Sequence, residues 1–261
     1  MPEGDTIHRA ARRMHRALAG KRIDHAESRA PKVSSARLVG ATIERVQARG
    51  KHLLIVLDDG RILRTHMQMT GSWHLYRTSD RWRRPRHRMV LLIETDPWHA
   101  VAFDLPQAEL LRSEGQSAQL RRLGPDLLDP ECDLDEALRR LTAAAELPLG
   151  VALMRQDLVA GIGNVYKSEV LFLERLDPFA PVGSVDVERL RAALDRARKL
   201  MRRNLRGRRR NTTGRADMVQ YVYGRSGERC PECGTTIRMK RQGDAGRSTY
   251  WCPSCQPAAT Q

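Results

Sequence analysis

The sequence is poor in aromatic residues and in cysteine, and it contains no long apolar run. Aromatic residues make up 5% of the 261 residues, although a hydrophobic content of 41% still supplies a real core. No run of 18 apolar residues occurs, so we expect no membrane span, and the N-terminus lacks the apolar stretch of a secretory signal. Five cysteines cannot form a closed disulfide set, which favours a reducing compartment.

Acidic residues are scarce relative to basic ones. The chain has 46 Lys+Arg against 31 Asp+Glu, a formal net charge of +15 at pH 7. Such an excess indicates a polyanionic partner, nucleic acid first. The alternative is a basic soluble protein whose arginine content reflects a GC-rich genome.

The first half of the chain reads as one helix followed by short strands. Asp5 to Ala19 has apolar residues at helical spacing, with Asp5 as the expected N-cap and Gly20 as a stop. Several strands at short spacing then predict an antiparallel sandwich or barrel. The expected strands are 41–49, 51–57, 61–66, 72–77, 88–94 and 100–105.

A turn-rich segment over residues 123–130 marks a domain boundary, and helical periodicity follows it. The expected helices are 134–141, 150–159, 164–176 and 187–205. Gly161-Ile162-Gly163 forms a tight break before the third helix, where Asn164 would cap the helix beside a phosphate-binding N-terminus. The alternative for this break is a plain turn between helices.

Four of the cysteines form two Cys-x-x-Cys pairs near the C-terminus, and four thiolates in such pairs match tetrahedral zinc. A closed four-sulfur shell indicates one structural Zn²⁺ rather than a catalytic ion. The insert between the pairs is strand-like, and we expect its hairpin loop to carry Lys240, Arg241, Gln242 and Arg247 toward phosphates. Cys132 stands apart and reads as an ordinary small side chain. The expected metal ligands are Cys230, Cys233, Cys252 and Cys255.

The first three residues offer a nucleophile. An initiator Met is commonly trimmed when a small residue follows, which would leave the secondary amine of Pro2 beside the carboxylate of Glu3. A terminal amine titrates near pH 8 (about 7.7–8.0), so part of it is unprotonated at neutral pH and can form an imine with a carbonyl carbon. The alternative is a frayed terminus without a role.

These parts, in this order, resemble the formamidopyrimidine-DNA glycosylase / endonuclease VIII family. The resemblance rests on Met1-Pro2-Glu3-Gly4, Arg49-Gly50-Lys51, the segment 161–169 and the four-cysteine finger, and it spans essentially the whole chain. It implies an α+β multidomain protein with an N-terminal helix plus antiparallel β-sandwich over 1–128. A helix-two-turn-helix domain over 129–225 and a zinc finger β-hairpin over 226–257 would follow.

The resemblance also implies roles for individual residues. Pro2 would attack C1′ of a damaged nucleotide, Glu3 would serve acid/base steps, and Lys51 would contact a phosphate at the lesion. Asn164 and Arg247 would clamp flanking phosphates. The turn residues Gln68, Met69 and Thr70 would fill the gap left by a flipped base. The partner would be damaged double-stranded DNA, bound by a monomer in the cytoplasm at the nucleoid.

Three departures from the family pattern favour the endonuclease VIII branch and therefore oxidised pyrimidines. Thr6 stands where many members have Glu, which leaves protonation of the sugar open. The Asp-Pro-Arg-Arg-Phe-Gly segment of the 8-oxoguanine branch is missing, and residues 103–110 replace it. The wedge would come from the place that the endonuclease VIII branch uses. The other two interpretations are a non-catalytic binder of damaged or abasic DNA and an 8-oxoguanine-preferring glycosylase.

Overall fold

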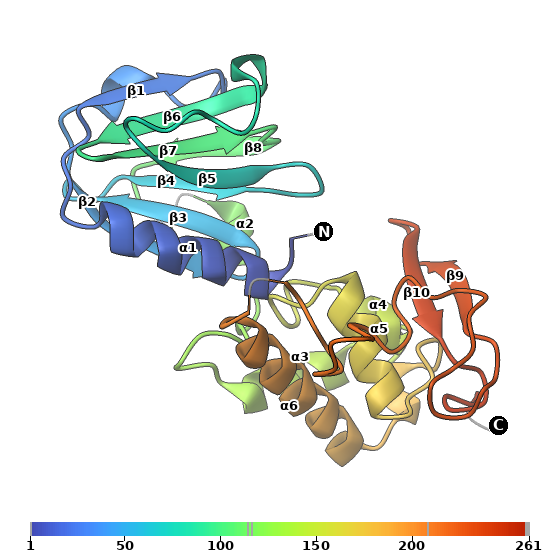
Figure 1. The fold of residues 1–261 in the computed structure, drawn as a ribbon. Helices are drawn as coiled ribbons and strands as arrows, with labels where there is room; N and C mark the ends of the chain where they lie inside the picture. Colours follow the sequence, from blue (N-terminus) through green and yellow to red (C-terminus); the bar gives the residue numbers. More distant parts are fainter. Residues whose placement is uncertain (1, 114, 116, 208, 259–261) are drawn as a thin grey trace. The chain divides into compact units, whose positions relative to one another are not determined.

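The protein is described by a computed structural model, which covers residues 2–113, 115, 117–207 and 209–258. The chain divides into two compact units, residues 1–122 and 123–261. Each unit has its own hydrophobic core, and together they combine helices with antiparallel sheets (Figure 1), which confirms the expected fold class. Among the described residues, no helix is both long and apolar enough to cross a membrane.

Helix α1 (Gly4–Leu18) opens the first unit and packs against β2 and β3. Its apolar face is buried as the spacing predicts, because Ile7, Ala11, Met14 and Leu18 all belong to the core. The prediction that Asp5 is the N-cap is wrong. Glu3 is the capping residue, since its carbonyl oxygen accepts the amides of Thr6 and Ile7 at 2.9 and 3.1 Å.

Two four-stranded antiparallel sheets form the rest of the first unit, with strand orders β1-β6-β7-β5 and β2-β3-β4-β8. Their inner faces and α1 enclose one shared core, which is a sandwich as expected. The two strands that the sequence did not indicate, β1 and β8, are short strands at sheet edges. The strands are β1 His25–Ser28, β2 Ile43–Arg49, β3 His52–Leu57, β4 Ile62–His66, β5 Ser72–Arg77, β6 Met89–Thr95, β7 Trp98–Phe103 and β8 Gln107–Leu111. Short helical turns are η1 Ser35–Arg37, η2 Arg86–Arg88 and α2 Ala118–Arg121.

The second unit is helical around its own core. Its elements are α3 Leu134–Ala143, α4 Leu149–Ala152, α5 Asn164–Leu173, η4 Val182–Ser184 and α6 Val187–Asn204. The expected helix 150–159 is wrong, because helical structure stops at Ala152. Instead, the backbone after Ala152 pairs with an earlier segment. The amide of Gly124 donates to the carbonyl of Gln156, and the amide of Ala160 donates to the carbonyl of Pro125. The expected helix 164–176 also ends early, at Leu173.

The finger at the end of the second unit is a two-stranded antiparallel hairpin, β9 (Arg238–Gln242) and β10 (Arg247–Trp251). This confirms the hairpin between the two cysteine pairs. The loop proper is only residues 243–246, however, so the prediction that it carries Lys240, Arg241 and Gln242 is wrong. These three residues belong to strand β9, and Arg247 is the first residue of β10, directly across from Gln242.

Candidate active site and metal centre

The N-terminal residues Pro2 and Glu3 lie where the chain enters α1. Pro2 is half-buried and Glu3 is buried completely, so this terminus is anchored rather than frayed. The positive end of the helix dipole favours negative charge in its vicinity. Met1, whose removal the proposed nucleophile requires, falls outside the described residues.

The first turn of α1 also contains the position where this chain departs from the family pattern. The Thr6 hydroxyl donates to Oδ1 of Asp5 at 3.3 Å, and Asp5 is fully buried. Asp5 therefore lies inside the first turn beside Glu3, with its carboxylate turned toward Thr6.

Lys51 stands in the tight connection between β2 and β3. Gly50 adopts a left-handed φ of 58°, which lets the chain reverse within two residues and leaves Lys51 half-buried next to the start of β3. The expected break at Gly50 is thus confirmed. Because α1 packs on β2 and β3, the N-terminal residues and Lys51 belong to the same compact unit.

Two histidines that the sequence reasoning did not single out accompany Lys51. His52 and His66 are cross-strand partners on β3 and β4, with ring centroids 4.8 Å apart. Burial is the largest cause that lowers the pKa of His52 to about 3, and the neighbouring His66 and Arg64 lower it further. Burial and the neighbouring Lys51 and Arg64 lower the pKa of His66 to about 4. Both rings are therefore neutral at physiological pH. Only the strand pairing reveals this cluster, since the two residues are 14 positions apart.

The buried histidine pair predicts a stability that decreases in mild acid. Unfolded histidine titrates near pH 6.5, and the folded-state values lie below that, so below pH 6.5 the unfolded chain binds more protons. We expect the unfolding free energy to fall by on the order of 2–4 kcal/mol between pH 6.5 and pH 4.5. Urea titrations across this range would measure it. The double variant His52→Gln/His66→Gln should flatten the dependence, whereas His25→Gln, at an exposed position, should leave it unchanged.

The connection between β4 and β5 presents Met69 to solvent. This side chain is 61% exposed, although Met67, two residues earlier, is buried in the core. Gln68 has a left-handed φ of 46°, and its amide donates to Nδ1 of His66 at 3.2 Å. The turn is therefore attached to the histidine pair.

The same turn is closed by its later residues. The amide of Gly71 donates to the carbonyl of Met67 at 2.8 Å, and a Cβ at Gly71 would lie only 2.7 Å from that oxygen. The Thr70 hydroxyl donates to the carbonyl of Asp104 at 3.2 Å. Met69 is thus an apolar side chain held outward on a defined turn, as a wedge requires.

In the second unit, Asn164 is the first residue of α5 rather than its cap, so that prediction is wrong. The capping residue is Gly163, which has extended backbone angles. The Asn164 side-chain amide instead donates to Oγ of Ser248 at 3.3 Å, next to Arg247 on β10. The structure thereby brings the start of α5 and the finger hairpin together.

Lys167 stabilises the contact between the start of α5 and the finger hairpin. It is 1% exposed, and its ammonium donates to Asn164 Oδ1, to the carbonyl of Ser248 and to Oγ1 of Thr249, at 3.3, 3.0 and 2.8 Å. A buried lysine is costly unless its protons are accepted in this way. The family motif over residues 161–169 contains Lys167, yet only the fold shows that it orients Asn164.

Glu169 likewise stabilises the position of the segment that follows α6. Its buried carboxylate accepts the backbone amides of Tyr221, Val222 and Tyr223 at 2.8–2.9 Å, and also the Thr212 hydroxyl. One side chain of α5 therefore holds a loop more than 40 residues away in sequence.

The four finger cysteines meet at one point. Their sulfur atoms lie within 4.8 Å of one another, with Cys230–Cys255 at 3.8 Å and Cys233–Cys252 at 3.4 Å. Four thiolates around tetrahedral Zn²⁺, each about 2.3 Å from the metal, have S···S separations of about 3.8 Å. The site fits one structural zinc ion. Cys132 lies apart from it and packs against the helical core.

Three family descriptions match consecutive parts of the chain. They are the formamidopyrimidine-DNA glycosylase N-terminal domain over residues 1–107, the H2TH domain of the same glycosylase over 123–215, and the zinc finger found in FPG and IleRS over 227–258. Together with the helix-led sandwich and the four-cysteine hairpin, these matches define a helix-two-turn-helix, zinc-finger protein. The chain belongs to the formamidopyrimidine-DNA glycosylase / endonuclease VIII family.

Full-length relatives support the same assignment. The probable endonuclease 8 2 of Streptomyces coelicolor is 41% identical over 98% of this chain and 94% of its own length. The DNA-(apurinic or apyrimidinic site) lyase Nei2 of Mycolicibacterium smegmatis is 38% identical over 99% of this chain and 100% of its own. In fold, the chain is similar to the formamidopyrimidine-DNA glycosylase of Lactococcus lactis crystallised with abasic-site DNA. That match has a TM-score of 0.82 and 24% identity, covering 98% and 100% of the two chains.

Proposed function

We propose that this protein is a bifunctional DNA glycosylase/AP lyase of base-excision repair, which removes oxidised bases, pyrimidines favoured, from double-stranded DNA. The observation that carries the proposal is the anchored start of the chain, where Pro2 and buried Glu3 immediately precede a helix docked on the core. The full-length relatives include a protein named as an AP lyase and one named as a probable endonuclease 8, which supports the same activity.

The chemistry follows from a secondary amine beside a carboxylate. The Pro2 nitrogen attacks C1′, the glycosidic bond breaks, and the base leaves with a proton. The C1′–O4′ bond then opens, O4′ takes up a proton, and an iminium forms between Pro2 and C1′. The resulting iminium acidifies the C2′ hydrogen, so that a base can remove it while the 3′ phosphate leaves. A second elimination expels the 5′ phosphate, and water hydrolyses the adduct to free the amine. Glu3 serves the proton transfers at the sugar.

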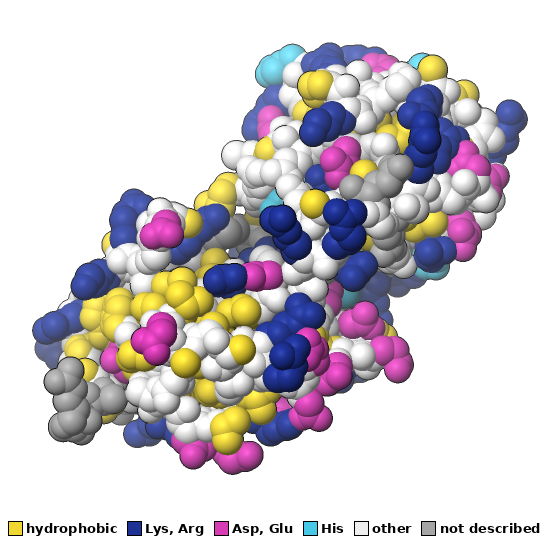
Figure 2. Space-filling view, turned by 180° about the vertical axis from the view of Figure 1, so that it is seen from behind, with side chains coloured by type: hydrophobic (Ala, Val, Ile, Leu, Met, Phe, Trp, Pro, Cys, Tyr) yellow, Lys and Arg dark blue, Asp and Glu magenta, His cyan; other side chains and the backbone are white. Residues whose placement is uncertain are grey.

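Phosphate contacts would hold the strand during these steps. In this proposal Lys51 contacts the lesion phosphate from the first unit, and Asn164 and Arg247 contact flanking phosphates from the second. The hydrogen bond between Asn164 and Ser248 supports joint use of α5 and the finger. Lys and Arg side chains are exposed on both units in the face that Figure 2 shows, as a polyanion partner requires.

The domain division that we propose is 1–128 for the catalytic sandwich, 129–225 for the helix-two-turn-helix domain and 226–257 for the finger. In this proposal the protein acts as a monomer at the nucleoid in the cytoplasm.

Borohydride trapping tests the activity. Protein is mixed with duplexes that carry an abasic site, thymine glycol, dihydrouracil or 8-oxoguanine, and sodium borohydride then reduces any imine. We expect a covalent adduct on a peptide that begins at Pro2, strongest with abasic and oxidised-pyrimidine duplexes. Binding without any adduct would identify a non-catalytic binder. Preference for 8-oxoguanine would move the protein to the other branch, and an adduct on Lys51 would rule out Pro2.

Met69 provides a test of the wedge. Unstacking a base from a duplex costs a few kcal/mol, and an inserted apolar side chain offsets part of that cost. We expect Met69→Ala to lower kcat/KM on a thymine glycol duplex by about tenfold, which corresponds to about 1.4 kcal/mol. On a single-stranded abasic oligonucleotide, which has no stack to fill, the same variant should retain activity. Val39→Ala removes another exposed apolar side chain from the same unit and serves as the control.

A further inference from the structure

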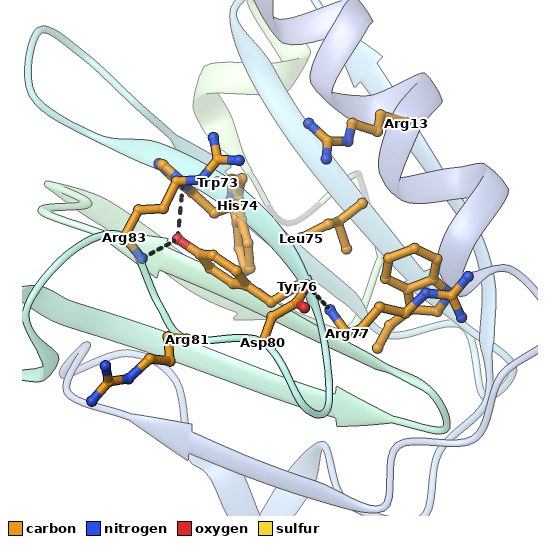
Figure 3. A pocket seen from close by; sticks show the side chains of 10 residues that line it. Arg13, Trp73, His74, Leu75, Tyr76, Arg77, Asp80, Arg81 and Arg83 are labelled. Carbon is orange, nitrogen blue, oxygen red and sulfur yellow. Dashed lines mark hydrogen bonds between the residues drawn. The ribbon is translucent and has the colours of Figure 1, made fainter.

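A hollow of about 690 Å³ lies beside strand β5 in the first unit, and the function above makes no use of it. It is lined by β5 itself, by Arg13 of α1, by Trp98 of β7 and by the loop over residues 80–83 (Figure 3). Its volume is within the range of sites that bind small ligands.

The hollow runs along an open sheet edge. Strand β5 is the last strand of its sheet and pairs only with β7, without a register shift. The Thr78 amide donates toward β7, to the carbonyl of Pro97, whereas the Arg77 amide points the other way and donates to Asp80. Because amide directions alternate along a strand, Trp73 and Leu75 direct their N–H and C=O groups to the open edge. Within the described ranges no other backbone group pairs with them there.

One wall of the hollow is preformed. Trp82 packs with Tyr76 and Phe103 on the outer face of the sheet, which anchors the loop over residues 80–83. The Arg83 amide donates to the Tyr76 hydroxyl at 3.1 Å, and that hydroxyl lies 3.2 Å from Nδ1 of His74 (Figure 3). The pKa of His74 is lowered, mainly by burial. The ring is therefore neutral, and its Nδ1 can accept a hydrogen bond from the Tyr76 hydroxyl. A ligand would therefore meet a wall that is already ordered.

Charge gives the hollow a marked preference for anions. Four arginines line it, and in the described part of the chain none of them forms an ion pair with a carboxylate. The Arg77 guanidinium stacks on Trp98, 4.1 Å from the ring centre. The lining has a single acid, Asp80, which already accepts the Arg77 amide. The lining arginines are Arg13, Arg77, Arg81 and Arg83.

We propose that this edge is a docking site for an acidic peptide segment of a partner protein, which adds to the sheet as an extended strand alongside β5. An exposed edge is a template for another strand, and added strands gain affinity from main-chain hydrogen bonds. The four arginines select an acidic strand and repel a second copy of this basic chain. A nucleic-acid strand could neutralise the arginines, but its sugar-phosphate backbone has no amide groups to pair with Trp73 and Leu75.

Fluorescence polarisation with a labelled eight-residue peptide of alternating Glu and Val tests the proposal. We expect Arg13→Glu/Arg83→Glu to weaken its binding at least tenfold. The control Arg12→Glu/Arg16→Glu, with the same change of net charge at exposed positions outside the hollow, should change it less than twofold. N-methylation of the amides on the edge of the peptide strand that pairs with β5 should also weaken binding at least tenfold. N-methylation of the amides on its opposite edge should weaken binding less than threefold. Amide hydrogen exchange of Trp73 and Leu75 should slow when the peptide binds.

The other outcomes would overturn the proposal. If the peptide does not bind, the arginines only protect a sheet edge. If neither pattern of N-methylation weakens binding, the attraction is electrostatic and no strand is added. If the Arg13/Arg83 variant loses affinity for a single-stranded oligonucleotide and not for the peptide, the hollow is a nucleic-acid contact. Thermal unfolding of each variant shows whether the fold is retained.

Discussion

A form of the protein with one extra residue before Pro2 should bind abasic duplex DNA and fail to cut it. The extra residue converts the Pro2 nitrogen into a tertiary amide, which cannot attack C1′, while Lys51, Asn164 and Arg247 keep their positions. A positioned reacting group has an effective molarity of 10⁵–10⁸ M, so we expect strand cleavage to fall by at least about 10³-fold. Affinity for the same duplex, measured by polarisation, should change less than threefold.

Matched variants distinguish the chemical role of the terminal amine from the structural role of the N-terminal residues. Pro2→Gly, with Met1 removed, retains a terminal amine and should retain a trappable adduct at a reduced rate. Glu3→Gln keeps the buried side chain's size and removes its charge. It should slow the chemical step while the Kd for DNA stays near its original value. Undiminished cutting by the extended form would eliminate Pro2 as the nucleophile.

Loss of the metal site should have the second large effect. Cys252→Ser removes one thiolate from a cluster that also forms much of the small finger core, together with Phe172, Val222 and Ile237. Structural zinc contributes about 10–16 kcal/mol to the folding of isolated fingers, so the β9–β10 hairpin should unfold. The α3–α6 core is a separate cluster and should persist. Loss of the charged contact from Arg247 would cost about 1.5–3 kcal/mol, or about 10- to 150-fold in DNA affinity.

Several measurements check this together. Zinc content should fall below one ion per chain, tryptophan fluorescence should report the change around Trp251, and DNA affinity should drop as stated. Cys132→Ser alters a cysteine outside the cluster and should leave all three unchanged. Full DNA affinity in the zinc-free Cys252→Ser variant would show that the finger is dispensable.

The larger elements could be predicted because their signals are local. The apolar spacing of α1, the alternation of the central strands and the paired cysteines all depend on residues close in sequence. The wrong helix over 150–159 and the two strands that were missed lie where distant segments decide local structure. The helix expected over 150–159 stops at Ala152 because its backbone pairs with residues 124–125. The residues of β1 and β8 carry only a weak strand pattern of their own. They form strands because a neighbouring strand pairs with each of them.

The sequence by itself determined the chemical inventory: an amine before an acid, a lysine after a glycine turn, four cysteines in zinc spacing and a strong positive charge. Tertiary structure alone decided which of these groups are held in place. Pairing of β3 with β4 placed a neutral histidine pair beside Lys51, and burial of Lys167 and Glu169 tied α5 to the finger and to the loop after α6. The open edge of β5, ringed by arginines from three segments, likewise exists only in the folded sheet. Such sites depend on which side chains and backbone groups become neighbours in the fold and which remain unpaired. The position of a residue in the sequence does not specify its neighbours in the fold.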